Sequence, residues 1–239
     1  MVYKTTSTTD FNLSLNECVE EAFERVGAEL RTGYDLRTAR RSLNLLLIDW
    51  ASRGLNLWTI EQGSIPLIPG TPSYNLPVDT VDLLDHVIRT GVSSTQVDIS
   101  ITRISGSTYS SIPNKNATGR PIQVWINRQS GATNNTSVVQ YPQIIVWPTP
   151  DSSIPYTFVY WRLRRLQDAG DGLNGQDIPF RFLPALVSGL AYYLSLKVPG
   201  GLERRGELKA EYEAQWELAS TEDREKASIR FVPRQSWLS

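Results

Sequence analysis

The feature that most constrains the fold of this chain is a long β-patterned stretch between two helical ends. Residues 58–177 are rich in Pro, Gly, Ser and Asn and contain short apolar runs, whereas the segments on either side carry apolar residues at helical spacing. A short helix pair cannot bury its apolar stripe alone. We therefore expect an α+β fold. Residues 1–57 and 178–227 form one discontinuous helical bundle, and residues 58–177 form a long antiparallel β-rich insertion.

The helical segments carry start and stop signals. Ser14 and Glu17 form a capping-box pattern that predicts a first helix over residues 14–31, and Gly33 allows the turn into a second helix that ends before Gly54. We expect these two helices to pair as an antiparallel hairpin. A third helix begins near Pro184, and a fourth covers residues 202–227. The predicted core positions are Leu43, Leu47, Trp50, Leu186, Leu190 and Leu194.

Charges on the first two helices gather on their outer faces. The first helix carries Glu20, Glu21, Glu24 and Arg31, and the second carries Arg37, Arg40 and Arg41. The simplest interpretation is a solvated surface with salt bridges, and a basic face turned toward DNA is the alternative.

Short strands fill the middle of the chain. The predicted strands cover residues 60–68, 74–76, 84–89, 97–103, 122–127, 144–147 and 156–164. In the last of these, alternate residues share a face, which indicates a half-buried antiparallel sheet. Proline at positions 66, 69 and 72 favours edge positions or bulges in the first part.

Composition excludes several classes of protein. Of the 239 residues 40% are hydrophobic, and 24 basic residues nearly balance 25 acidic ones, so no bulk charge draws the chain to nucleic acid or to an anionic membrane. Cys18, the single cysteine, excludes an intrachain disulfide. The longest apolar run, residues 183–196, is too short and too interrupted to span a bilayer. We expect a soluble protein made in a cytoplasm.

No assembled catalytic or metal-binding motif is present in the sequence. The chain lacks nucleophile elbows, phosphate loops, dinucleotide loops and zinc-binding patterns. His86, the only histidine, is expected to be a hydrogen-bonded structural residue. Asp79, Asp82 and Asp85 are expected at turns or helix starts and not on a metal. The loop over residues 168–177 departs from the calcium-loop pattern and is a connector. We predict no enzyme activity, no metal and no cofactor.

Three stretches together resemble a known family. They are residues 40–58 (RRSLNLLLIDWASRGLNLW), residues 111–121 (SIPNKNATGRP) followed by 144–151 (IIVWPTPD), and residues 183–194 (LPALVSGLAYYL). These stretches are similar to the head-to-tail adaptors of short-tailed bacteriophages, also called tail tubular protein A or head completion proteins. The β-patterned stretch is longer here than in the smallest adaptors.

The resemblance implies a structural virion protein at the head–tail junction, synthesised in the host cytoplasm. It implies a ring, usually of twelve copies, that binds the portal protein and presents the tail nozzle or the next tail component. Such a ring lines the DNA exit channel, so its contact with passing DNA is transient and non-specific. No membrane contact is implied. The alternative function is a carbohydrate- or receptor-binding tail component carried by the β-rich module, and an enzyme that degrades cell-wall polymer comes third.

The last residues of the chain, 228–239, predict an extended arm. This segment is too apolar for a random tail and too short to fold alone. Related adaptors grip the portal with a C-terminal arm, so the resemblance makes this arm a portal- or neighbour-binding site. Its candidate anchors are Ile229, Phe231, Val232, Trp237 and Leu238.

Overall fold

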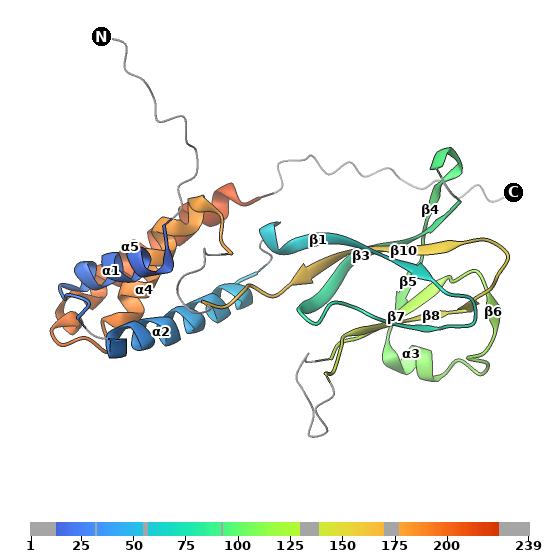
Figure 1. Cartoon of the computed structure of the whole chain (residues 1–239), viewed down its shortest axis with the longest axis horizontal. Helices are drawn as coiled ribbons and strands as arrows, with labels where there is room; N and C mark the ends of the chain where they lie inside the picture. Colours follow the sequence, from blue (N-terminus) through green and yellow to red (C-terminus); the bar gives the residue numbers. More distant parts are fainter. Residues whose placement is uncertain are drawn as a thin grey trace, which may run out of the picture. The chain divides into compact units, whose positions relative to one another are not determined.

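The computed structural model describes residues 13–31, 33–54, 57–91, 93–129, 139–169 and 177–224 (Figure 1). It divides the chain into two compact units. The helical unit contains the described residues up to Leu46 and from Ala169 onward, and the β unit contains those from Leu47 to Asp168. The chain therefore leaves the helical unit within one helix and returns to it far later in the sequence.

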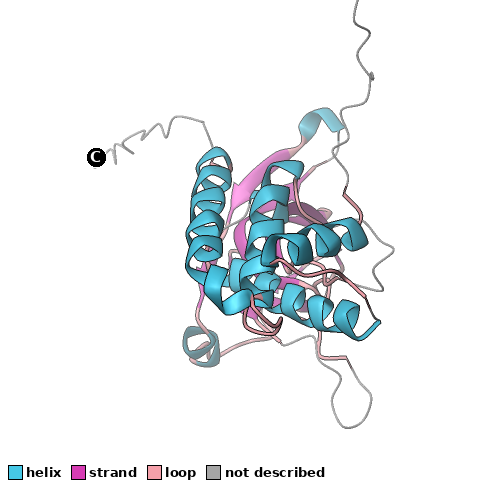
Figure 2. Ribbon diagram, turned by 90° about the vertical axis from the view of Figure 1, so that its left-hand side faces the viewer, coloured by secondary structure: helices cyan, strands magenta, loops and turns pink. Residues whose placement is uncertain are grey.

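The helical unit is assembled from both parts of the chain. Its helices are α1 (Leu15–Val26), the first part of α2 (Gly33–Ser52), α4 (Leu183–Leu194) and α5 (Gly201–Glu222), with a short 3-10 turn, η3 (Phe180–Phe182), before α4. Figure 2 shows these helices grouped together. Helix α4 packs against both α1 and α5. Most of α4 is therefore buried, as its apolar sequence predicts.

A glycine on α4 lies where side chains of α2 and α5 meet this helix. A methyl group added to Gly189 would lie 2.9 Å from the ring of Tyr212 on α5 and 3.0 Å from a methyl carbon of Leu46 on α2. Real side chains do not approach so closely, so only glycine fits there. All six predicted core positions are buried, which confirms that prediction: Leu43, Leu47, Trp50, Leu186, Leu190 and Leu194.

The ends of α1 follow local rules. The Ser14 backbone N–H donates to Glu17 Oε2 at 2.7 Å, and the Glu17 N–H donates back to Ser14 Oγ at 3.3 Å, which confirms the capping box. The helix ends at Gly27, whose φ of 90° is left-handed. The predicted end near residue 31 was therefore wrong. Gly33, which we expected in the turn, is the first residue of α2.

The β unit is built around two four-stranded sheets. The first has the order β1 (Ile60–Leu67), β10 (Tyr156–Arg164), β3 (Thr80–Thr90) and β4 (Val97–Ser100), all antiparallel. The second has the order β2 (Ser73–Asn75), β8 (Gln143–Trp147), β7 (Gln123–Asn127) and β5 (Thr102–Ile104), in which only the β5–β7 pair is parallel. The chain passes from the first sheet to the second at Ile101, between β4 and β5.

Minor elements complete this unit. They are the 3-10 turns η1 (Leu57–Thr59) and η2 (Ser93–Thr95), the short helix α3 (Gly106–Ser110), and the strand pair β6 (Thr118–Gly119) and β9 (Thr149–Pro150). Helix α3 lies against the second sheet, where Tyr109 stacks on Trp125 with ring centroids 5.2 Å apart.

The two sheets share one apolar core. Its members come from the first sheet (Leu67, Leu83, Ile88, Tyr156, Phe158, Tyr160) and from the second sheet and its flanks (Tyr74, Leu76, Val124, Ile126, Ile144, Val146). Strand β10 matches its predicted bounds, and β1, β2, β3, β7 and β8 fall within a few residues of theirs. The single strand predicted over residues 97–103 was wrong, because the chain changes sheets at Ile101 and forms β4 and β5 instead. The short strands β6 and β9 were not predicted. Separate helices and mostly antiparallel sheets are compatible with the predicted α+β class. In the described residues, no helix is both long enough and apolar enough to cross a membrane.

Candidate functional site

The arm predicted from the sequence falls outside the part of the chain that the structure describes. Ile229, Phe231, Val232, Trp237 and Leu238 all follow the last described residue, Arg224. Most of the calcium-like loop, residues 170–176, also lies outside the described ranges. Both remain predictions.

The three candidate carboxylates are each engaged by neighbouring protein groups. Asp79 pairs with Arg162 at 2.5 Å, and Asp82 pairs with Arg103 at 2.9 Å. Asp85 accepts the backbone N–H of His86 at 2.8 Å. Asp82 and Asp85 lie within strand β3, so the expected place at turns or helix starts was wrong for both. Among the described residues, no group of three or more His, Cys, Asp or Glu side chains could hold a metal ion.

His86 is buried, but it is not the hydrogen-bonded residue that we expected. Its ring stacks on Phe158 with centroids 5.9 Å apart, and neither ring nitrogen makes a hydrogen bond within the described residues. Burial lowers the pKa of His86 from its usual value. The positive charge of Arg103 also lowers this pKa, whereas the negative charge of Asp85 raises it. The imidazole is therefore neutral near pH 7. The charge of Asp85 and the backbone of Ile101 favour the protonated ring, but burial outweighs them.

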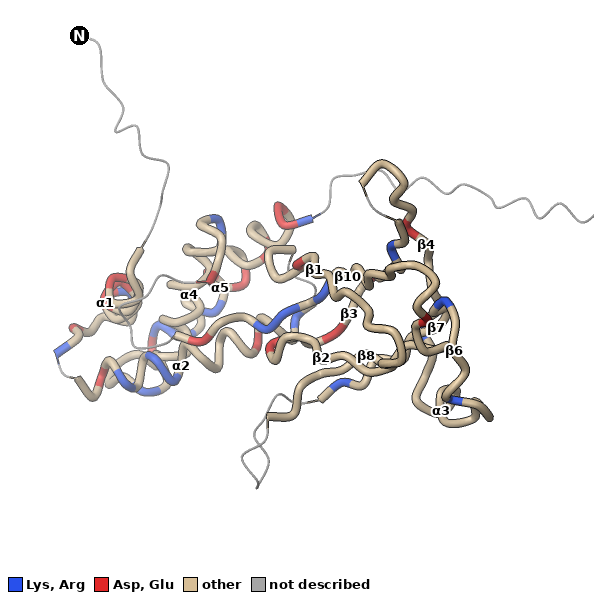
Figure 3. The backbone as a smooth tube through the Cα atoms, turned by 45° about the vertical axis from the view of Figure 1, so that its right-hand side comes forward, with Lys and Arg blue, Asp and Glu red and all other residues tan. Residues whose placement is uncertain are grey.

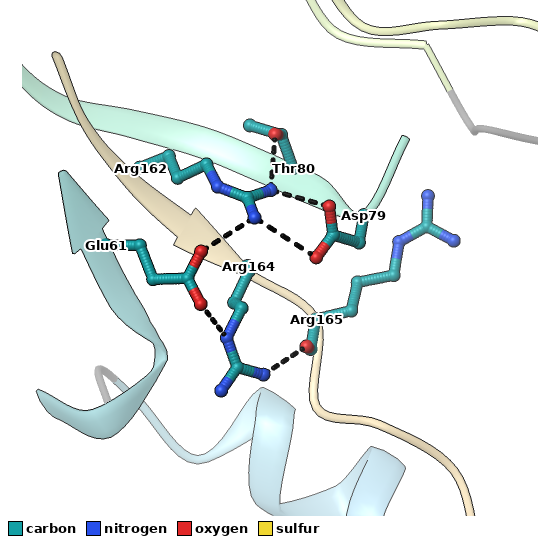
Figure 4. A network of polar contacts seen from close by, with 6 residues as sticks. All are labelled: Glu61, Asp79, Thr80, Arg162, Arg164 and Arg165. Carbon is teal, nitrogen blue, oxygen red and sulfur yellow. Dashed lines mark hydrogen bonds and ion pairs between the residues drawn. The ribbon is translucent and has the colours of Figure 1, made fainter. Parts of the chain in front are cut away.

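A partly buried ionic cluster joins three strands of the first sheet (Figure 4). Arg162 on β10 contacts Glu61 on β1 at 2.7 Å and Asp79 before β3 at 2.5 Å. Arg164, two residues along on the same face, contacts Glu61 at 2.7 Å. The side chains of Arg162 and Arg164 are each only 11% exposed. We define these four residues as the ionic cluster.

The protonation states in the ionic cluster follow from opposing effects. Burial disfavours the charged form of Asp79, but the hydrogen bonds and charge of Arg162 outweigh burial and hold the pKa of Asp79 below its usual value. Burial also opposes the charge of Arg162, yet Asp79 and Glu61 raise the pKa of Arg162. Asp79 and Arg162 are therefore both ionised near neutral pH. The cluster ties β1, β10 and β3 together and leaves none of its own groups free to act as a nucleophile or base.

The outer surface of α2 is basic and exposed. Tyr34, Arg37, Arg40, Arg41 and Asn44 line a hollow of about 590 Å³. None of the three arginines forms an ion pair with a carboxylate of the described residues, and the buried Nε of Arg40 has no hydrogen-bond partner there. Figure 3 shows the basic segments along this part of α2. We call this surface the basic face.

An acidic groove lies on the same unit, between α1 and the start of α4. Its floor is apolar, with Leu183 and Val187 buried beneath it, and its volume is about 420 Å³. Its lining includes four glutamates, Glu17, Glu20, Glu21 and Glu24, and a single cation, Arg25. We call this surface the acidic groove.

The glutamates of the acidic groove differ in their partners. Glu21 pairs with Arg25 at 2.9 Å, and Glu17 caps the start of α1. Glu20 and Glu24 form no ion pair with the described residues. The predicted salt-bridged surface on α1 and α2 is therefore only partly formed. Arg25 and Arg31 have acidic partners, whereas the arginines of the basic face have none among the residues that the structure describes.

A model of one known protein family matches nearly the whole chain. The family model described as SU10 adaptor protein matches residues 19–233, which include most of both units. No curated protein matches the chain.

Proposed function

The chain belongs to the SU10 adaptor protein family, and on that premise we propose that it forms a ring between the portal and the tail of a phage particle. The family agrees with the adaptor resemblance of the sequence and makes the chain a structural phage protein and a virion component. The family match over residues 19–233 is the observation that carries the proposal. By resemblance the ring has twelve copies and lines the DNA exit channel.

The architecture supports this proposal in physical terms. A ring requires two different lateral surfaces on each subunit, since each copy contacts one neighbour on either side. It also requires separate surfaces for the components above and below. We propose that the helices of both chain ends act as one bundle, that the β-rich insertion supplies a further surface, and that residues 228–239 bind the portal or a neighbour.

A map of the virion tests the ring. Cryo-electron microscopy of the phage that carries this gene should show copies of both units around the axis, between the portal and the next tail component. Density for this chain at any other place in the particle would contradict the proposal. The copy number is read from the same map.

Truncation tests the arm. A chain that ends at Ala227 should keep its stability and lose attachment to the portal, because the arm supplies docking contacts and not core. The single change Trp237→Ala should weaken docking by about 2 kcal/mol or more if this side chain is an anchor. Lower stability with attachment intact would show instead that the segment folds back on its own unit.

A second candidate function rests on a polar hollow in the β unit. Asn75, Gln129, Gln140, Gln143 and Tyr141 are among the residues that line about 450 Å³ there. Amide and aromatic side chains are suited to sugar hydroxyl groups and rings. This hollow favours a carbohydrate-binding role for the β unit. A glycan array with the purified chain, and with Tyr141→Ala as the control, tests it.

A further inference from the structure

The basic face and the acidic groove are complementary in charge, and both lie on the helical unit. The basic face presents three arginines without a carboxylate partner among the described residues. The acidic groove presents Glu20 and Glu24, which likewise lack a cationic partner there. We propose that the basic face of one copy docks in the acidic groove of the next. This inference rests on the proposed ring and identifies its lateral contact.

Exposed apolar groups indicate a protein as the partner. Tyr34 is 64% exposed and Leu45 is 54% exposed. These two residues and Arg37 and Arg41 are spaced three or four residues apart along α2, so all four lie on one face of the helix. The acidic groove offers an apolar floor at Leu183 and Val187 beneath its glutamates. An apolar centre with a charged rim is the usual composition of a protein interface. A phosphate backbone has charge but no such floor for Tyr34 and Leu45.

The net charge of the chain is consistent with a second copy as occupant. With a formal net charge of −1, two copies experience little overall electrostatic repulsion. A contact between copies neutralises both surfaces at once. Since the two surfaces differ, the contact is heterologous and leaves one of each kind free on every dimer. Such a contact adds further copies, and it gives a closed ring when the rotations between successive copies sum to a full turn.

Arg40 is the least exposed arginine of the basic face. Its Nε is buried and has no hydrogen-bond partner in the described chain. A buried guanidinium donor without an acceptor is unfavourable. Because that nitrogen is closed to solvent, a neighbouring copy cannot reach it, and the proposed contact is made by the exposed side chains of Arg37 and Arg41.

Paired charge reversals test this contact in the full-length chain. One variant carries Arg37→Glu and Arg41→Glu, and the other carries Glu20→Lys and Glu24→Lys. Each variant alone places like charges in contact, so the fraction assembled into rings on portal-bearing heads should fall about tenfold or more. Mixing the two variants should restore assembly when they alternate around the ring. The reversed, acidic face of the first variant then meets the reversed, basic groove of the second. The unchanged basic face of the second variant meets the unchanged acidic groove of the first. Native mass spectrometry and negative-stain images give the readout.

The control is a charge reversal of the same size elsewhere on the helical unit. Glu203→Lys with Glu207→Lys changes two exposed glutamates on α5 and should assemble as the unchanged chain does. Circular dichroism establishes that all variants fold. Normal assembly of either reversed variant, or failure of the mixture to restore rings, overturns the proposed contact while the ring itself stands.

Two further outcomes distinguish the contact between copies from a missing ring and from a surface for nucleic acid. If the unchanged chain forms no ring on portal-bearing heads, the proposed function fails and the contact fails with it. If the Arg37→Glu and Arg41→Glu variant forms normal rings but these retain less DNA than rings of the unchanged chain, the basic face serves nucleic acid and the contact between copies is wrong.

Discussion

In the β unit, Arg162 and Arg164 are buried and bound by Glu61 and Asp79, whereas in the helical unit Arg37, Arg40 and Arg41 lack a carboxylate partner among the described residues. The same residue type therefore does two different things. In the β unit it joins neighbouring strands of one sheet. In the helical unit it remains available to a molecule outside the chain. Partner surfaces in such a protein are found by asking which charges the fold leaves unsatisfied.

The largest expected effect tests whether the helical unit has a core of its own. Leu190→Ala removes a fully buried side chain from α4 and should lower the free energy of unfolding of this unit by about 2 to 5 kcal/mol. Hydrogen exchange measured by mass spectrometry reports the loss of stability separately for the helical unit and the β unit. Leu218→Ala, at an exposed position of α5, is the control and should change it by less than about 0.5 kcal/mol. A loss below about 1 kcal/mol for Leu190→Ala would show that this face is not core.

A smaller effect tests the ionic cluster of the β unit. Arg162→Gln leaves Glu61 and Asp79 without their shared cation and should destabilise the β unit by about 1 to 3 kcal/mol. Both carboxylates are partly exposed, so solvent screening keeps the effect below that of a fully buried pair. Arg31→Gln breaks a solvent-exposed pair in the helical unit and should cost less than about 0.5 kcal/mol. If urea denaturation gave equal losses of stability for Arg162→Gln and Arg31→Gln, the ionic cluster would contribute no more than an exposed ion pair, which would contradict the contrast between the two units.

The smallest effect is a pH dependence confined to one unit. The pKa of His86 is lowered in the folded chain, so the unfolded chain binds more protons. Stability that is present above the unfolded pKa, about 6.5, should therefore be lost progressively as the pH falls below that value, by at most about 1.4 kcal/mol for each pH unit. Only the β unit should respond, because the chain has no other histidine. His86→Leu should flatten the dependence, and an unchanged slope in that variant would assign it to other groups.

Local signals in the sequence predicted the elements well. The capping box of Ser14 and Glu17, the burial of Leu190 and the bounds of β10 all depend on residues close in sequence. Such signals do not say which elements meet. The sequence suggested that α1 pairs with α2, but α1 packs mainly on α4, from the other part of the chain. Helix pairing depends on matching surfaces across long separations, and these leave no local pattern.

The candidate surfaces were predicted less well than the fold. Helical spacing placed Arg37, Arg40 and Arg41 on an outer face, but it could not show which carboxylates the packing brings near them. The ionic cluster was missed for the same reason. Alternation along β10 placed Arg162 and Arg164 on one face, and only the strand order brings Glu61 and Asp79 to them. The signal that could have found it was a pair of arginines at alternate positions of an otherwise apolar strand.

The strand order also has a consequence for synthesis. Strand β10 is the last of its unit to be made, yet it lies between β1 and β3, and α1 likewise requires α4 from the late part of the chain. During translation, long stretches with unpaired strand edges therefore emerge from the ribosome before either unit can complete its fold. Contacts between residues so distant in sequence also form slowly. Nascent chains arrested before residue 156 should be digested by protease throughout. Resistance should arise late in translation, and early resistance of β1 and β3 would contradict this order of events.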